Sequence, residues 1–236
     1  MKTTLISSSL IIFIFLLTTS CMDYEDDGPI QYKEENFTIT DFNRVDVSDA
    51  IVIEIKQAEY YSIKARGDRR NLDDLQVRKS GNTLLVHFED WDNRQHTTYL
   101  EITMPRLLAA NLSGATNGNI YGFTNLDHFD LQLSGAAIAQ TQVLTESISI
   151  NLSGASILNL RGKATEAQQT LSGASSLKAL DFQADEVNIS ASGASVAKIW
   201  ATMQLKANVS GASLVSYKGN PSIESQVTDS SVLRKE

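Results

Sequence analysis

A single cysteine, Cys21, leaves this chain of 236 residues without the two thiols that an internal disulfide needs. Only three histidines are present, His87, His96 and His128, and they lie in different segments without the spacing of metal ligands. Nucleophile elbows, phosphate-binding loops and dinucleotide fingerprints are also missing from the sequence. The sequence therefore predicts no metal site, no cofactor and no catalytic residues.

An excess of basic residues is missing too. The net charge is -8, and the pair Arg69-Arg70 stands beside acidic residues rather than in a basic stripe. Because nucleic-acid affinity depends on clustered Lys and Arg, a nucleic-acid partner is not expected. The longest apolar stretch, Leu5–Leu17, falls short of the about 20 residues that span a bilayer.

The N-terminus has the pattern of a secretory signal. Lys2 precedes the apolar stretch, and small residues follow it. We interpret residues 1–20 as a signal peptide that is removed, in preference to a buried helix.

The segment after the signal predicts a lipid anchor. Thr18-Thr19-Ser20-Cys21 resembles the lipobox of bacterial lipoproteins, although Thr18 stands where that motif has leucine. We expect Cys21 to be acylated; the alternative is a free thiol beside the cleavage site. Residues 21–36 are acidic and predict a tether, which is a plain linker or resembles the surface-export signal of Bacteroidetes lipoproteins. The expected location is the outer membrane, surface-exposed or facing the periplasm, with membrane contact through the anchor only.

A tripeptide repeat organises the rest of the chain. Ser-Gly-Ala occurs six times, beginning at Ser113, Ser134, Ser153, Ser172, Ser192 and Ser210. The successive spacings are 21, 19, 19, 20 and 18 residues. A nearly fixed period of this length indicates a solenoid in which each repeat is one coil. Residues 106–219 are assigned to it.

Apolar residues recur at every second position on both sides of the tripeptide, as in Ile148-Ser149-Ile150-Asn151-Leu152. This is strand periodicity, and no sustained helical spacing competes with it. Two short strands per coil predict an all-β fold, a right-handed parallel β-helix with about 20 residues per coil.

The tripeptide suits a stacked corner. Glycine tolerates the turn and the close approach of the next coil, and stacked serine hydroxyls could bond to one another. We therefore predict a structural ladder; the alternative is that this exposed ladder meets a ligand. Its residues are Ser113, Gly114, Ser134, Gly135, Ser153, Gly154, Ser172, Gly173, Ser192, Gly193, Ser210 and Gly211.

The segments on either side of the repeats are expected to protect the ends of the rod, where strand edges would be exposed. Residues 37–105 contain alternating runs such as Ile51–Ile55 and Tyr99–Met104, which predict a β segment packed on the solenoid. Residues 220–236 are expected to form a closing strand and tail.

These segments together resemble a known family. The runs Phe42–Val47, Ile51–Ile55, Leu84–Val86 and Tyr99–Pro105, followed by the Ser-Gly-Ala coils, are similar to the head GIN domain of auto-transporter adhesins, which is common in Bacteroidetes lipoproteins. The resemblance covers Phe37 to Ser216 and implies a β-helix, an envelope location and no catalytic residues. Val47-Ser48-Asp49-Ala50 departs from the family by replacing a glycine-containing stretch, which puts the geometry of the first coil in question.

The predicted function is a non-catalytic adhesin or binding module that displays a β-helical face to a surface glycan or an envelope protein. Trp91, in the polar loop Glu89–Arg94, is the candidate ligand-binding residue; the alternative is that it covers the core. Two other functions remain open: a polysaccharide lyase or glycosidase, and a purely structural protein. Against the enzyme, no acidic residue recurs beside another when the coils are aligned on their tripeptides.

Overall fold

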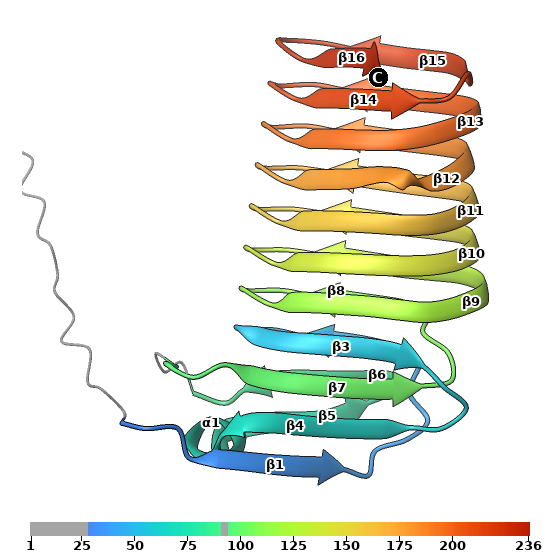
Figure 1. Cartoon of the computed structure of the whole chain (residues 1–236). Coiled ribbons are helices and arrows are strands. Elements are labelled where there is room, and N and C mark those ends of the chain that lie inside the picture. The colour runs from blue at the N-terminus through green and yellow to red at the C-terminus, as the bar shows by residue number, and fades with distance from the viewer. Residues whose placement is uncertain (1–27, 91–93) are drawn as a thin grey trace, which may run out of the picture.

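The computed structural model describes residues 28–90 and 94–236, which lie mostly in β-strands of one upright rod (Figure 1). Five long strands each form one coil: β9 (Asn117–Leu133), β10 (Ile138–Leu152), β11 (Ile157–Leu171), β12 (Ser176–Ala191) and β13 (Val196–Val209). Shorter strands lie toward the N-terminal end: β1 (Tyr32–Phe37), β2 (Arg44–Val47), β3 (Ile51–Gln57), β4 (Ser62–Asp68), β5 (Leu75–Ser80), β6 (Thr83–Phe88), β7 (Thr98–Met104) and β8 (Ala109–Leu112). The C-terminal end adds β14 (Leu214–Lys218), β15 (Ser222–Val227) and β16 (Val232–Lys235).

Each long strand bends once and thereby contributes to two faces of the rod (Figure 1). We call the side toward the viewer the front face; it contains the first half of each coil together with β3 and β7. The back face contains the second half of each coil together with β2 and β8. Successive coils pair in parallel, and the chain winds in the right-handed sense. The predicted right-handed β-helix of about 20 residues per coil is therefore confirmed.

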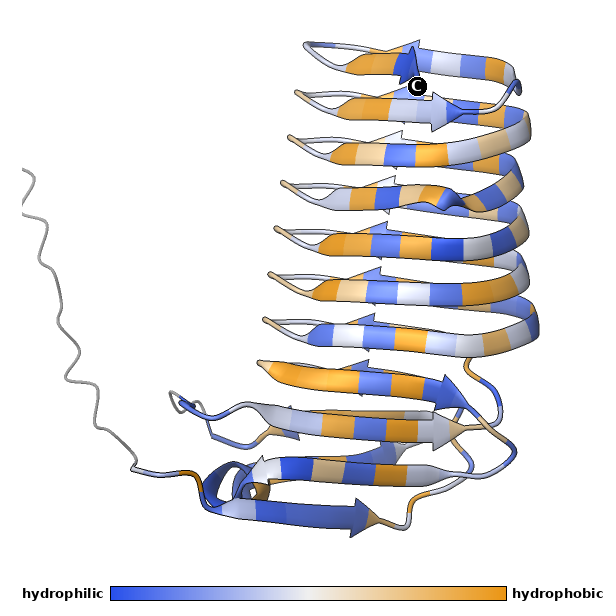
Figure 2. Cartoon of the chain, viewed as in Figure 1, coloured by the Kyte–Doolittle hydropathy of each residue, from blue (hydrophilic) through white to orange (hydrophobic). Residues whose placement is uncertain are grey.

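Alternation along each strand builds the core. In β10, Ala139, Val143, Ile148 and Ile150 point inward and are buried, while their neighbours face solvent. Figure 2 shows the same exchange of apolar and polar residues along every coil. Inward residues stack on those of the next coil and form a single buried cluster from Phe42 to Val215. Burial of this cluster stabilises the rod by the hydrophobic effect.

The backbone at the Ser-Gly-Ala corners bonds directly from coil to coil. The N–H of Ala155 donates to the Gly135 carbonyl over 2.7 Å, and Ala174 donates to Gly154 over the same distance. Gly154 has a φ of 70°, and a Cβ there would lie 2.6 Å from the Gly135 oxygen. Glycine is thus needed at an interior corner for two reasons, the left-handed conformation and the close approach.

Serine hydroxyls contribute differently from the expected ladder. Ser192 Oγ donates to the Leu171 carbonyl over 3.3 Å, and no bond joins two tripeptide serines in the part of the chain that the structure describes. A buried serine follows each of the last four tripeptides, at Ser156, Ser175, Ser195 and Ser213, and Ser195 and Ser213 share a 3.2 Å hydrogen bond. The expected hydroxyl ladder is corrected accordingly: backbone groups, not tripeptide side chains, hold the corner stack together.

Aspartate takes the place of glycine at the N-terminal end of this stack. Asp49 has a φ of 73°, and its carbonyl accepts the N–H of Ala115 over 3.0 Å. Its carboxylate turns toward the neighbouring strand β6 and accepts the N–H of Phe88 over 2.8 Å. The stretch that departs from the family therefore keeps the corner geometry of the later coils.

The C-terminal end repeats the substitution. Asp229 has a φ of 57°, and Ser230 donates to the Gly211 carbonyl over 3.0 Å, longer than the 2.7–2.8 Å of the interior corners. The Asp229 carboxylate accepts the N–H of Gly211 over 3.0 Å. Residues 220–236 thus form one further coil, made of β15 and β16, rather than a single closing strand.

The N-terminal segment is interleaved with the solenoid. The coil made by β2 and β3 lies between the coil of β6 and β7 and the coil of β8 and β9, out of chain order. Residues 37–105 therefore extend both faces in register instead of packing on an end. Outermost on the two faces are β1 and β5, which run antiparallel to their neighbours, β4 and β6.

A short helix covers the N-terminal end of the core. Helix α1 (Arg69–Asp74) packs on β4 and β1 and buries Leu72. Asp68 caps it: the carboxylate accepts the N–H of Arg70 over 2.9 Å and that of Gln31 over 2.8 Å. The guanidinium of Arg70 lies 2.8 Å from the same carboxylate. These hydrogen bonds, that of the Arg70 side chain foremost, hold the pKa of Asp68 well below its usual range.

The corner geometry predicts a large cost for one added methyl group. We expect Gly154→Ala to lower the free energy of unfolding by about 3 kcal/mol, because the methyl group collides with a backbone oxygen in a strained conformation. Gly81→Ala is the matched control, since Gly81 has a φ of 57° and open space around it. We expect that control to cost about 1 kcal/mol. Urea unfolding measures both, and equal losses would contradict the close-approach argument.

The Asp68 cap predicts a pH dependence. Because the folded pKa of Asp68 lies below the unfolded value, its contribution is present above about pH 4 and is lost as the pH falls. We expect Asp68→Asn to destabilise the fold by about 2 kcal/mol at pH 7 and to reduce the acid sensitivity of the Tm. Asp73→Asn, at an exposed ion pair with Lys33, should change little. The Tm of the parent chain and of both variants is measured from pH 7 to pH 3. If the Tm of Asp68→Asn falls with pH as steeply as that of the parent chain, the Asp68 cap is not the source of the acid sensitivity.

Candidate functional site

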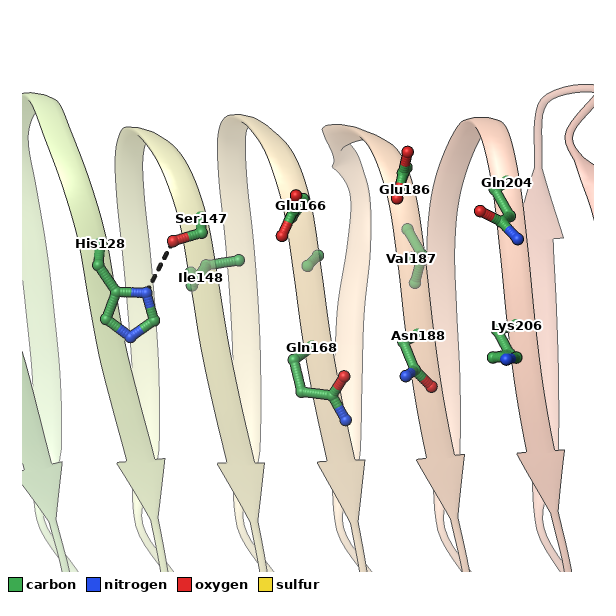
Figure 3. Close-up of a pocket in the computed structure, with 11 residues that line it drawn as sticks. His128, Ser147, Ile148, Glu166, Gln168, Glu186, Val187, Asn188, Gln204 and Lys206 are labelled. Atoms are coloured by element: carbon green, nitrogen blue, oxygen red, sulfur yellow. Dashed lines mark hydrogen bonds between the residues drawn. The ribbon is translucent and has the colours of Figure 1, made fainter.

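A shallow groove crosses several coils of the back face (Figure 3). Its volume is about 420 Å³, and polar side chains of β9 to β13 border a floor of strand backbone at Ile148, Ala167 and Val187, whose side chains point inward and are buried. We call it the back-face groove. Its lining residues are His128, Ser147, Ile148, Glu166, Ala167, Gln168, Glu186, Val187, Asn188, Gln204 and Lys206.

Parallel register arranges the polar side chains in two rows. The first row runs His128, Ser147, Glu166, Glu186 and Gln204, with each residue paired to the next across adjacent strands. The second row lies two residues further along each strand and includes Gln168, Asn188 and Lys206. Since alternate residues share a face, both rows point outward, and the apolar residues between them point into the core.

Five of these side chains make no hydrogen bond or ion pair within residues 28–90 and 94–236: Glu166, Gln168, Glu186, Asn188 and Gln204. Amides offer donors and acceptors, and ionised carboxylates accept. Neighbouring strands lie roughly 4.8 Å apart, so these groups form a regular grid. The groove therefore presents unused hydrogen-bonding capacity to a ligand that lies along the rod.

One end of the groove is ordered by His128. Its Nδ1 lies 2.7 Å from Ser147 Oγ, and its Nε2 lies 2.8 Å from Asp130 Oδ1. Serine, histidine and aspartate are the residue types of a hydrolase triad. The histidine side chain is 47% exposed, however, and the surrounding N–H groups belong to parallel strand ladders rather than to an oxyanion hole. This trio fixes the imidazole at the end of the groove and lacks the donors for acyl transfer.

Two carboxylates meet in the groove, which corrects an inference drawn from the sequence. Glu166 and Glu186 are register partners on β11 and β12, and both are exposed. Aligning the coils forward from the tripeptide separates them, because Glu166 follows Ser153 by 13 residues and Glu186 follows Ser172 by 14. The difference arises where β11 and β12 shift register between Asn159 and Arg161.

Counting backward from the next corner finds the whole row. His128, Ser147, Glu166, Glu186 and Gln204 each precede the serine of the following tripeptide by six residues. The back-face half of every coil has constant length, whereas the bend before it varies. This signal was present in the sequence and was missed.

A column of uncharged polar residues runs beside the groove. Asn111 pairs with Gln132, and the column continues through the coils to β15. None of its side chains carries a formal charge between these two ends. The members are Asn111, Gln132, Asn151, Thr170, Ser190, Asn208 and Gln226.

The residues singled out in the sequence are distributed as follows. Cys21 and Trp91 lie outside the described residues, so the lipid attachment and the loop ligand site stay predictions. The twelve Ser and Gly positions of the ladder stack at one corner, remote in register from the groove rows. Among residues 28–90 and 94–236 there is no group of three or more His, Cys, Asp or Glu placed to hold a metal ion.

The fold defines the class of this chain: a parallel β-solenoid with open sheet faces. The chain belongs to the family described as "Putative auto-transporter adhesin, head GIN domain", whose model matches residues 41–221. The resemblance inferred from the strand runs and the Ser-Gly-Ala coils is thereby confirmed. Membership of an adhesin family indicates a cell-surface or envelope location and gives no indication of catalysis. The described part of the chain contains no helix long and apolar enough to cross a bilayer.

Solved structures share the fold at low sequence identity. A "putative adhesin" from Bacteroides fragilis is 20% identical with a TM-score of 0.77, covering 87% of this chain and 96% of its own. A "putative adhesin" from Parabacteroides distasonis is 15% identical with a TM-score of 0.73, covering 89% and 98%. A "putative lipid binding protein" from the same organism is 16% identical with a TM-score of 0.70, covering 87% and 96%. A comparison with curated proteins finds no match.

Proposed function

We propose that this protein is a non-catalytic binding module of the outer cell envelope, anchored by a lipid on Cys21, and that its back-face groove binds a glycan. The observation that carries the proposal is the set of five polar side chains that stand in two rows along the groove without a partner in the described part of the chain. Labelled fatty acid should enter the whole chain and be absent from Cys21→Ala; equal labelling would refute the anchor.

The chemistry of the groove favours a sugar over other ligands. Amide and carboxylate groups on adjacent coils can bond to successive hydroxyls of a chain of sugars that lies along the rod. Glu166 and Glu186 repel polyanions, while Lys206 is engaged by Glu224 at 3.2 Å. A neutral or amino-substituted glycan fits best, and an envelope protein is the other candidate partner.

A pair of double variants tests the groove. We expect Gln168→Ala with Asn188→Ala to weaken glycan binding about 30-fold, because two hydrogen bonds of about 1 kcal/mol each are lost. Gln140→Ala with Asn159→Ala is the matched control: the same residue types, paired across adjacent coils, on the front face. Binding is measured on a glycan array with the chain from Asp23 onward. Equal weakening in both double variants, or binding to no glycan, would count against the groove as a sugar site.

The same array tests the loop residue predicted from the sequence. Binding that is lost in Trp91→Ala and kept in the groove variant would move the site to the loop Glu89–Arg94. Loss of binding in Trp91→Ala and also in the groove double variant would indicate that the loop and the groove form one binding surface.

A second function has a specific observation in its favour. Glu166 and Glu186 lie on adjacent strands roughly 4.8 Å apart, near the about 5–5.5 Å between the carboxyls of retaining glycosidases. Both carboxylates are exposed, however, and neither lies in an apolar pocket of the kind that surrounds the general acid of lysozyme.

We expect no release of reducing ends from any glycan that binds the array. Hydrolysis by the wild-type chain that is abolished by Glu166→Gln, and unaffected by Glu224→Gln on the same face, would establish the enzyme instead. Hydrolysis that persists unchanged in both variants would point to a contaminating activity and leave the chain non-catalytic.

A further inference from the structure

The front face carries an exposed apolar stripe beside the Ser-Gly-Ala corner. Four of its side chains are 38–46% exposed: Tyr99, Ile138, Val196 and Val232. Strand register places them in one column with Val52, Ile157 and Leu214, across the coils from β7 to β16. Single exposed apolar residues are ordinary, but seven in one column, interrupted by Asn117 and Ser176, form a patch of the kind that marks an interaction surface.

The order of residues in the stripe is self-complementary. Read from β7 toward the middle, the stripe is Tyr99, Val52, Asn117 and Ile138. Read from β14 toward the same point, it is Leu214, Val196, Ser176 and Ile157. Each half therefore has a large apolar residue, a valine, a small polar residue and an isoleucine. A two-fold rotation about an axis between Ile138 and Ile157 therefore brings each residue of one half opposite the residue of similar type in the other half of a second copy.

The neighbouring row, two residues further along each strand, shows the matching pattern of charge. Its N-terminal half is acidic, with Glu101 and Glu54, and its C-terminal half is basic, with Lys178 and Lys198. Uncharged Asn119, Gln140 and Asn159 lie between them. The same rotation that pairs the apolar stripe sets Glu54 opposite Lys198.

We propose that the front face binds a second copy of this chain in an antiparallel, two-fold symmetric dimer. Each surface would meet itself, as an isologous interface requires. Eight coils at roughly 4.8 Å spacing and about five residues of strand give roughly 600 Å² per copy, at the lower end of stable interfaces. This inference is independent of the glycan proposal, which concerns the opposite face.

Charge decides between the two symmetric arrangements. A parallel pair of rods would set Glu54 against Glu54 and Lys198 against Lys198, which is repulsive. Glu54 is already oriented by Tyr121, whose hydroxyl donates to it over 2.6 Å. Lys198 lies 2.7 Å from Glu236, Glu54 lies 3.8 Å from Lys56 and Glu101 lies 3.3 Å from Arg66, so these interfacial charges are shared. Lys178 has no ion pair in the described part of the chain. The antiparallel dimer therefore gains most where the basic half of one copy covers the acidic half of the other.

Cross-linking of the whole chain in intact cells tests the proposal. Asn117→Cys with Ser176→Cys should yield a cross-linked dimer with a bis-maleimide of about 10 Å reach, the usual separation of packed sheets. Within one copy these positions lie three coils apart, roughly 14 Å, beyond that reach. Gln132→Cys with Ser190→Cys is the matched pair on the back face, also three coils apart. The chain without added cysteines is the second control, because it measures any dimer that forms through Cys21. Dimer yield at least tenfold above both controls supports the proposal, and equal yields overturn it.

A second variant separates the interface from chance proximity. Ile138→Lys places a charge beside the two-fold axis and should lower the dimer yield of the front-face pair at least tenfold. Leu144→Lys is its control, since Leu144 is 46% exposed in the same coil but lies outside the stripe. Equal yields in both lysine variants, whether lowered or not, would overturn the stripe as the dimer surface.

Discussion

The fold depends on how closely two backbones approach at one corner. An Ala N–H and a Gly carbonyl meet there at 2.7 Å, and a Cβ on the glycine would lie 2.6 Å from the same carbonyl oxygen. This contact fixes the rise from coil to coil and therefore the register of every strand that leaves the corner. Because register in a parallel sheet puts equivalent residues directly above one another, each position in the coil becomes a column along the rod. Both the groove and the stripe are columns of this kind.

The opposite bend is less constrained, and the molecule uses it to absorb differences in coil length. Spacings between tripeptides range from 18 to 21 residues, and the register shifts of β9 to β13 cluster in and around this bend. In the back-face half of each coil, the groove-row residue nevertheless always stands six positions before the next serine. Irregularity is confined to one corner, so the side chains beyond it still align in rows.

The features predicted correctly from the sequence follow from local chemistry. Each coil needs glycine at its left-handed, crowded corner and apolar residues at alternate positions. Because these needs recur in every coil, the repeat makes them recognisable in the sequence. The groove was missed because Glu166 and Glu186 align only when the coils are counted from the corner that closes them. The place of β2 and β3 between later strands was also missed, because alternation shows a strand but not its neighbours. Asp49 looked like a defect in the pattern, although at an end of the stack its side chain has room to bond to Phe88.

The same constraint explains why this fold is shared at so little sequence identity. The three solved structures that are 15–20% identical to this chain superpose with TM-scores of 0.70–0.77. Corner glycines and inward side chains carry the packing, and they occupy a minority of each coil. Outward residues contact few neighbours, so they can change with small effects on stability. A solenoid of this kind can therefore vary the chemistry of either face, in spacings set by its backbone, without altering the corner that holds its coils together. Different members can then recognise different partners on one scaffold, which is why the groove residues of this chain, rather than its fold, must decide what it binds.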